Sequence, residues 1–235
     1  MISKQPIKPY LSIPIVDCGE PLVPIPPELF VLENPPPYLQ LGADYGDENP
    51  YCLREGVLRA LLEARNHLNI AMAGWKLKIF DAYRPVNVQQ YMVDYTFRKI
   101  IEQRGILIED SEGIWHEVYK IWAVPSNNPK TPPPHSTGAA VDLTLVDSHN
   151  EEIDMGGQID ELSDRSEPDY YRDRLDQQEY QIRREILLDI MTKAGFRRHP
   201  GEWWHFSLGD QMWTWQYNLE IPSQTSIARY GRVRI

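Results

Sequence analysis

Prolines recur throughout the first 50 residues of this 235-residue chain and rule out long helices there. Proline lacks a backbone N–H and fixes φ near about −65°, and the residue before it is biased toward extended conformations. Examples are Pro24, Pro26, Pro27 and the run 35–37. We therefore expect residues 1–50 to form an extended, proline-rich arm with short strands, which wraps the core or lines the mouth of a site.

Beyond residue 50, segments of helical and of strand periodicity alternate. Apolar residues spaced by three or four positions predict helices, and strict alternation predicts strands. Helices are expected at 55–73, 85–103, 111–124 and 174–194, and strands at 75–80, 139–146, 203–208 and 213–217. Residues 147–173 are polar and acidic, which favours a long loop of the kind that serves as a lid.

This order of elements predicts an α+β fold with a central antiparallel sheet, flanking helices and the proline-rich N-terminal arm. The length suits one domain, 1–235, divided into the arm 1–50 and a core 51–235. Along the strand 139–146 successive side chains point to opposite faces, so Val141 should enter the core while Asp142 faces a site. The apolar residues of the last helix that should point inward are Ile182, Ile186, Leu187, Ile190 and Met191.

Composition excludes several classes of partner. The net charge is −10, the isoelectric point is about 5.1, and basic residues do not cluster, so no nucleic-acid partner is expected. No stretch reaches the roughly 20 apolar residues of a membrane-spanning helix. Cys18 and Cys52 are the only cysteines, which favours free thiols in a reducing compartment. We expect a cytoplasmic protein without a membrane partner, and its oligomeric state stays open.

The segment His135–Asp142 and the segment Glu202–His205 carry two imidazoles and two carboxylates. Gly138 lets the chain turn tightly, so His135 and Asp142 can converge on one ion. Three protein ligands with an open fourth position are typical of a catalytic zinc site. Glu202 is then free to act as general base, although Glu-x-x-His spacing alone is weak evidence. Asp142 has an alternative role as the partner of a nearby arginine.

Arg84 lies where a predicted strand meets a predicted helix, in the run Asp81-Ala82-Tyr83-Arg84-Pro85. Its planar guanidinium could hold a carbonyl oxygen or a carboxylate, or it could form a salt bridge with Asp81 or Asp94. The tryptophans near the C-terminus are interpreted as core and pocket wall. The remaining histidines lack ligand partners at useful spacing and are interpreted as surface or internally satisfied residues: His67, His116, His149 and His199.

These three segments resemble the D-alanyl-D-alanine dipeptidases of the VanX type in residues, order and spacing, and the related D,D-carboxypeptidases share two of them. The resemblance covers about residues 50–210, with the Asp154-Met155-Gly156 loop ending in Asp160. It implies one zinc ion per chain, held by His135, Asp142 and His205.

The same resemblance implies roles for the other site residues. Glu202 would be the catalytic base, Arg84 would stabilise the developing oxyanion, and Asp160 would bind the substrate ammonium. Tyr83 and Trp204 are included as substrate-binding candidates. One departure concerns specificity: these enzymes carry a serine two residues before the first histidine ligand, where this chain has Pro133.

The expected function is zinc-dependent hydrolysis of small dipeptides such as D-Ala-D-Ala. One alternative keeps the chemistry and changes the substrate, as in a D,D-carboxypeptidase or peptidoglycan endopeptidase. Another is a non-catalytic zinc-binding recognition domain, which should have lost the base or the oxyanion stabiliser. The exact dipeptide and the physiological role, whether wall turnover, scavenging or antibiotic tolerance, stay open.

Overall fold

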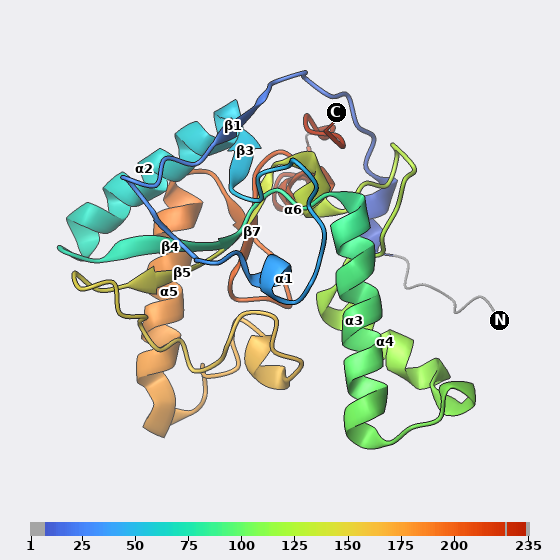
Figure 1. Ribbon diagram of the computed structural model, residues 1–235. Helices are drawn as coiled ribbons and strands as arrows, with labels where there is room; N and C mark the ends of the chain where they lie inside the picture. Colours follow the sequence, from blue (N-terminus) through green and yellow to red (C-terminus); the bar gives the residue numbers. More distant parts are fainter. Residues whose placement is uncertain (1–7, 224, 234–235) are drawn as a thin grey trace.

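A computed structural model describes residues 8–223 and 225–233 (Figure 1). Its main sheet has five strands in the order β2-β4-β5-β7-β6. Their bounds are β2 Val31–Leu32, β4 Lys76–Asp81, β5 Ala140–Val146, β7 His205–Ser207 and β6 Arg197–Arg198. The α+β class is confirmed. The sheet is antiparallel except at its β2 edge, where the arm adds a short strand parallel to β4.

The described part of the proline-rich arm, residues 8–50, makes only short elements. A second, two-stranded sheet pairs β1 (Leu22–Pro24) with β3 (Cys52–Arg54). One turn of 3-10 helix, η1 (Pro9–Ser12), and one turn of α-helix, α1 (Pro37–Gln40), each begin at or next to proline, the residue best suited to a first helical turn.

Two helices, α2 (Glu55–Ala71) and α5 (Gln178–Lys193), pack against each other beside the sheet (Figure 1). In α2 the buried residues Val57, Leu61, Ala64 and Leu68 recur every three or four positions, which produces one apolar stripe. In α5 Leu187, Ile190 and Met191 are buried as predicted. Ile182, however, is 54% exposed, so the expectation that it points inward is wrong.

A second helical pair, α3 (Val86–Arg104) and α4 (Glu112–Ile121), stands on the other side of the molecule (Figure 1). It has its own buried apolar cluster, which includes Tyr38 of α1 and Trp122 after α4. The larger cluster contains the apolar face of the sheet, α2 and α5. The chain between β4 and α3 passes from one cluster to the other, and this is the segment that carries Arg84.

One predicted element is wrong. Residues 213–217 were expected to form a strand, but they lie in α6 (Gln211–Glu220). The alternation of Trp213, Trp215 and Tyr217 imitates a strand period, whereas the Asp210 side chain accepts a hydrogen bond from the backbone N–H of Trp213 at 2.8 Å and caps a helix. The cap and tertiary packing decide the outcome here.

The region 147–173 has little regular structure, as expected for a long loop. It contains a bridge between Val146 and Glu152 and one turn of 3-10 helix, η4 (Asp164–Ser166). In the part of the chain that the structure describes, no helix is long and apolar enough to cross a membrane.

Candidate functional site

Three neighbouring strands bring Asp81, Asp142 and His205 side by side. Asp142 of β5 is the register partner of Asp81 at the end of β4 and of His205 at the start of β7. Residues opposite each other across a sheet point to the same face, so these side chains share one surface. His135 reaches that surface from η3 (Pro134–Thr137), which Gly138, at φ 68°, joins to β5.

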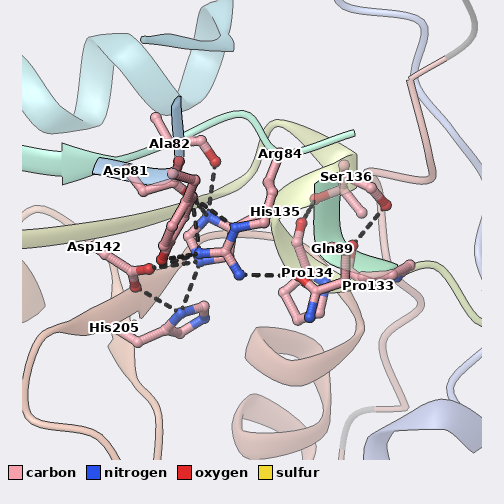
Figure 2. A network of polar contacts seen from close by, with 12 residues as sticks. Asp81, Ala82, Arg84, Gln89, Pro133, Pro134, His135, Ser136, Asp142 and His205 are labelled. Atoms are coloured by element: carbon pink, nitrogen blue, oxygen red, sulfur yellow. Dashed lines mark hydrogen bonds and ion pairs between the residues drawn. The ribbon is translucent and has the colours of Figure 1, made fainter. Parts of the chain in front are cut away.

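The ligand atoms of His135, Asp142 and His205 converge in a buried cluster (Figure 2). His135 Nε2 lies 3.1 Å from Asp142 Oδ2 and 3.1 Å from His205 Nδ1, and His205 Nδ1 lies 2.9 Å from Asp142 Oδ1. Atoms that bind zinc tetrahedrally at 2.0–2.1 Å lie about 3.3 Å apart. The spacing and the donor set therefore fit one metal ion of this kind.

The backbone carbonyl of Ala82 and the carboxylate of Asp81 hold the His135 ring. His135 Nδ1 lies 2.7 Å from the Ala82 oxygen and 3.3 Å from Asp81 Oδ2. An N–H at Nδ1 that donates to this carbonyl leaves the Nε2 lone pair facing Asp142 and His205. Such an outer partner fixes the orientation and the proton position of a metal-binding imidazole.

Electrostatics holds Asp142 in its ionised form. Burial alone would raise the pKa of Asp142, but the neighbouring His135 and His205 bring that pKa well below its usual range. Burial lowers the pKa of His205, which favours the neutral ring. The pKa of His135 is raised because the Asp142 carboxylate outweighs the effect of burial. A divalent cation can take the place of the protons shared between an ionised carboxylate and imidazole nitrogens arranged in this way.

Arg84 sits at the centre of a buried polar network beside this cluster. Its Nε donates to Asp81 Oδ2 at 3.0 Å, and its Nη1 donates to Gln89 Oε1 at 2.9 Å. Its Nη2 donates to the Tyr38 hydroxyl at 2.9 Å and to Asp142 Oδ2 at 3.1 Å. The salt bridge with Asp81 considered from sequence is present, and so is the pairing of Asp142 with an arginine. Both coexist with the metal-type cluster.

Two aromatic rings, those of Tyr38 and Trp122, lie against the Arg84 guanidinium. Its carbon lies 4.6 Å from the ring centre of Tyr38 and 5.0 Å from that of Trp122. These cation–π contacts and four engaged N–H donors hold the Arg84 guanidinium in place. One hydrogen on Nη1 has no partner among the described residues and remains available to an incoming oxygen.

Glu202 lies just outside β7, in an irregular turn that begins at Pro200-Gly201, as its spacing from His205 required. Its Oε2 is 3.9 Å from His205 Nδ1, and its Oε1 is 3.4 Å from His199 Nδ1. Burial, followed by the charges of Asp142 and Asp160, raises its pKa well above 4.5. A carboxyl group with a raised pKa suits proton transfer near neutral pH.

Two residues of this site escaped the sequence analysis. His199 was interpreted as a surface or satisfied residue, but it lines the same cavity as Glu202, and burial lowers its pKa well below 6.5. The three-residue steps from His199 to Glu202 to His205 were a usable signal. Tyr38 comes from the arm and carried no signal, because its contacts with Arg84 and Asp160 span 46 and 122 residues.

Asp160 comes from the long loop and reaches the same cavity. Its Oδ2 accepts a hydrogen bond from the Tyr38 hydroxyl at 2.8 Å, and its backbone adopts φ 62°. Burial, followed by the charge of Asp142, raises the pKa of Asp160 to about 7. The loop therefore contributes a carboxylate within the electrostatic reach of the cluster.

Tyr83 and Trp204 do not line this cavity, so the structure does not support their predicted role in substrate binding. Tyr83 faces a different cavity that Glu48 and Arg232 also line, because successive side chains around Arg84 point in opposite directions. Trp204 is 1% exposed and belongs to the main hydrophobic core. Pro133 lines a neighbouring cavity and not this one.

The cavity at the cluster has a volume of about 30 Å³. Three carboxylates and three cationic side chains line it, the cations being Lys8, Arg84 and Lys120. Its remaining wall comes from η1, α3, the end of α4 and the segment before β7.

Comparison with known proteins identifies the family. The model of the Peptidase_M15 family, described as D-ala-D-ala dipeptidase, matches residues 33–226. The chain belongs to this family. It is 55% identical to a D-alanyl-D-alanine dipeptidase of Synechocystis sp. over 97% of this chain and 98% of that protein. It is 33% identical to the Escherichia coli D-alanyl-D-alanine dipeptidase over 58% of this chain and 57% of that one.

Family membership makes the protein a metallopeptidase, and the His135, Asp142 and His205 cluster is the group that could hold its metal. Among solved structures, the chain resembles a vancomycin-resistance D,D-pentapeptidase, VanY, solved in complex with Zn(II). That match has 15% identity and a TM-score of 0.46, and it covers 87% of this chain and 91% of the other.

Proposed function

We propose that this metallopeptidase is a zinc-dependent dipeptidase that hydrolyses small dipeptides such as D-Ala-D-Ala. The observation that carries the proposal is the convergence of His135 Nε2, Asp142 and His205 Nδ1 within 4.8 Å beside the buried Glu202. The names of the relatives support the substrate, since the Synechocystis and Escherichia coli proteins are both D-alanyl-D-alanine dipeptidases.

In this proposal His135, Asp142 and His205 hold one zinc ion per chain. When bound, zinc supplies a Lewis acid that polarises a carbonyl group and makes water more acidic. A set of three protein ligands would suit a catalytic site, and Glu202 lies beside it, with its Oε2 3.9 Å from His205 Nδ1.

The chain's own residues supply the proton transfers and the charge stabilisation. Glu202 takes a proton from the attacking water and delivers it to the nitrogen of the leaving amine. The spare Nη1 hydrogen of Arg84 donates to the carbonyl oxygen as negative charge develops on it. Asp160, oriented by Tyr38, binds the ammonium group of the substrate. Arg84 can do this without reorganising, because its other donors are already engaged.

Two other functions are less well supported. A D,D-carboxypeptidase or endopeptidase would use the same chemistry on a longer chain, whereas the relative that is 55% identical is named a dipeptidase. A non-catalytic zinc-binding domain has no use for a buried carboxylate with a raised pKa beside the cluster, and Glu202 is such a group.

The same proposal covers the setting of the enzyme. We propose one domain, 1–235, acting in the cytoplasm without nucleic-acid or membrane partners. The unpaired Cys18 and Cys52 and the net charge of −10 support this setting. Fractionation of cells that express the protein would test it.

Hydrolysis of a panel of dipeptides tests the proposed function. Zinc-loaded enzyme should cleave D-Ala-D-Ala, and L-Ala-D-Ala and L-Ala-L-Ala report on discrimination at each residue. Release of alanine, followed by mass spectrometry, gives kcat/KM for each substrate. No cleavage of any of the three by enzyme that contains zinc would overturn the proposal.

A further inference from the structure

A free dipeptide carries a carboxylate as well as an ammonium group, and the site roles described so far leave the carboxylate without a partner. The cations that line the cavity are Lys8, Arg84 and Lys120. Arg84 is committed to Asp81, Asp142, Gln89 and Tyr38. Its spare donor faces the reacting carbonyl in the proposed mechanism. The two lysines are therefore the candidates for the carboxylate.

Lys8 is the better placed of the two. It is partly buried, and its ammonium group forms no ion pair with any described residue. Lys8 lines the same cavity as Glu202, His199 and the three residues of the metal-type cluster. Its side chain therefore reaches the cavity in which the peptide bond would be cleaved.

The arm segment that carries Lys8 is fixed to the core. Gln211 of α6 donates through its Nε2 to the Ile13 carbonyl at 2.6 Å, and η1 packs against α6. The Lys8 carbonyl accepts a hydrogen bond from the Leu11 N–H at 3.1 Å. Tyr10, in the same turn, is 7% exposed and lines the cavity. Lys8 therefore approaches the cavity from an anchored turn.

Together with Ala123 and Pro134, Lys8 and Tyr10 line both this cavity and a second one of about 240 Å³, so these two side chains lie at the boundary between the cavities. In a dipeptide the carboxylate carbon is three bonds from the scissile carbonyl carbon, about 3–4 Å away. A longer peptide would have an uncharged amide at that point and would have to continue past these two side chains.

We propose that Lys8 binds the C-terminal carboxylate of the substrate, and that η1 thereby restricts the enzyme to dipeptides with a free carboxylate. This inference rests on the proposed function and names the residue that selects the substrate's length. Lys120, exposed in the last turn of α4, adds positive charge at the mouth of the cavity.

Kinetics on D-Ala-D-Ala and on its C-terminal amide test the assignment. Lys8→Met in zinc-loaded enzyme should raise the KM for the free acid by about 10–100-fold, as expected for loss of a charged hydrogen bond, with little change in kcat. The KM for the amide should not move. Lys8→Arg should restore most of the affinity, and Lys120→Met should have the smaller effect. Lys99→Met, at an exposed residue of α3 outside the cavity, is the matched control.

Other outcomes would overturn the assignment. An unchanged KM in Lys8→Met, an equal rise for acid and amide, or a larger effect of Lys120→Met would each do so. Calorimetry with zinc-loaded Glu202→Gln, with and without Lys8→Met, measures D-Ala-D-Ala binding without turnover. If this binding depends on Lys8 but zinc-loaded wild type never cleaves the dipeptide, the proposed function is refuted while the carboxylate site is supported. Equal zinc contents in all variants show that the metal centre is intact.

Discussion

At the scale of single residues, the site consists of charges that neutralise one another. Asp142 faces both histidines and Arg84, so its carboxylate serves the metal-type cluster and the guanidinium at once. His135, Asp142, Glu202 and His205 were predictable, because each lies in a short motif whose spacing has a chemical meaning. Tyr38 was not predictable, since its contacts with Arg84 and Asp160 arise only when the arm folds back on the core.

A substitution at Pro133 tests whether the departure from the VanX-type pattern governs substrate specificity. It lies at the start of η3, where its carbonyl accepts the Ser136 hydroxyl at 2.7 Å, and its ring offers no hydroxyl to a substrate (Figure 2). Because Pro133 lines the neighbouring cavity and not the one at the cluster, Pro133→Ser should leave the ratio of kcat/KM for D-Ala-D-Ala and L-Ala-D-Ala nearly unchanged. A changed ratio, measured with both proteins at full zinc occupancy, would mean that residue 133 does set specificity, since polar contacts to a substrate discriminate more strongly than shape.

At the scale of elements, the sheet register was the part that sequence could not supply. Periodicity located α2, α3, α5, β4 and β5 to within a few residues, but pairing partners are non-local. The residue-by-residue alignment of Asp81, Asp142 and His205 across β4, β5 and β7 is what assembles the site. The same limitation explains α6, where local alternation of aromatic residues predicted a strand. The boundary at residue 50 stays a prediction, and contacts such as β2 with β4 cross it.

The turn between η3 and β5 gives a prediction at this scale. Gly138 and Gly105 both have positive φ, at 68° and 62°. A Cβ at Gly138 would collide with Leu22 Cδ2, so the Leu22 side chain would have to shift, whereas a Cβ at Gly105 meets nothing within 4 Å. Gly105→Ala should cost about 1 kcal/mol of unfolding free energy, from backbone strain alone, and leave zinc affinity unchanged.

Gly138→Ala should cost more than Gly105→Ala and should also weaken zinc binding, because the turn positions His135 relative to Asp142. Chemical denaturation and competition with a metal chelator give the two quantities. Equal losses of stability and unchanged zinc affinity in both variants would show that the turn does not position the ligands.

At the scale of the whole molecule, the arm and the long loop complete a site that the core alone leaves open. The arm contributes Lys8, Tyr10 and Tyr38, and the loop contributes Asp160. The charges of the site also link its chemistry to the stability of the fold. Burial raises the pKa of Asp81, Asp160 and Glu202, so the metal-free protein holds these groups at a cost once they ionise.

The raised pKa of Asp160 predicts the direction in which the stability of the fold changes with pH. Its pKa is about 7 in the folded protein and 3.8 as the ordinary value, so the folded state binds the proton more tightly. The associated stability is complete below pH 3.8 and is lost as the pH rises through about 7. Between pH 5 and 8, metal-free wild type should lose about 2–3 kcal/mol of stability relative to Asp160→Asn. An equal difference in unfolding free energy between the two proteins at pH 5 and at pH 8 would refute the raised pKa of Asp160.

Asp142 is assigned to metal binding and Glu202 to proton transfer, and one paired measurement tests this division of roles. Zinc content and kcat on D-Ala-D-Ala are measured for wild type, Glu202→Gln and Asp142→Asn. Wild type should contain about one zinc per chain. Glu202→Gln should keep its zinc while kcat falls by about 10²–10⁴-fold or more. Asp142→Asn should lose zinc first, with activity partly recovered in excess zinc. Loss of zinc from Glu202→Gln with retention by Asp142→Asn would exchange the two roles, and full activity of Glu202→Gln would contradict the hydrolytic mechanism.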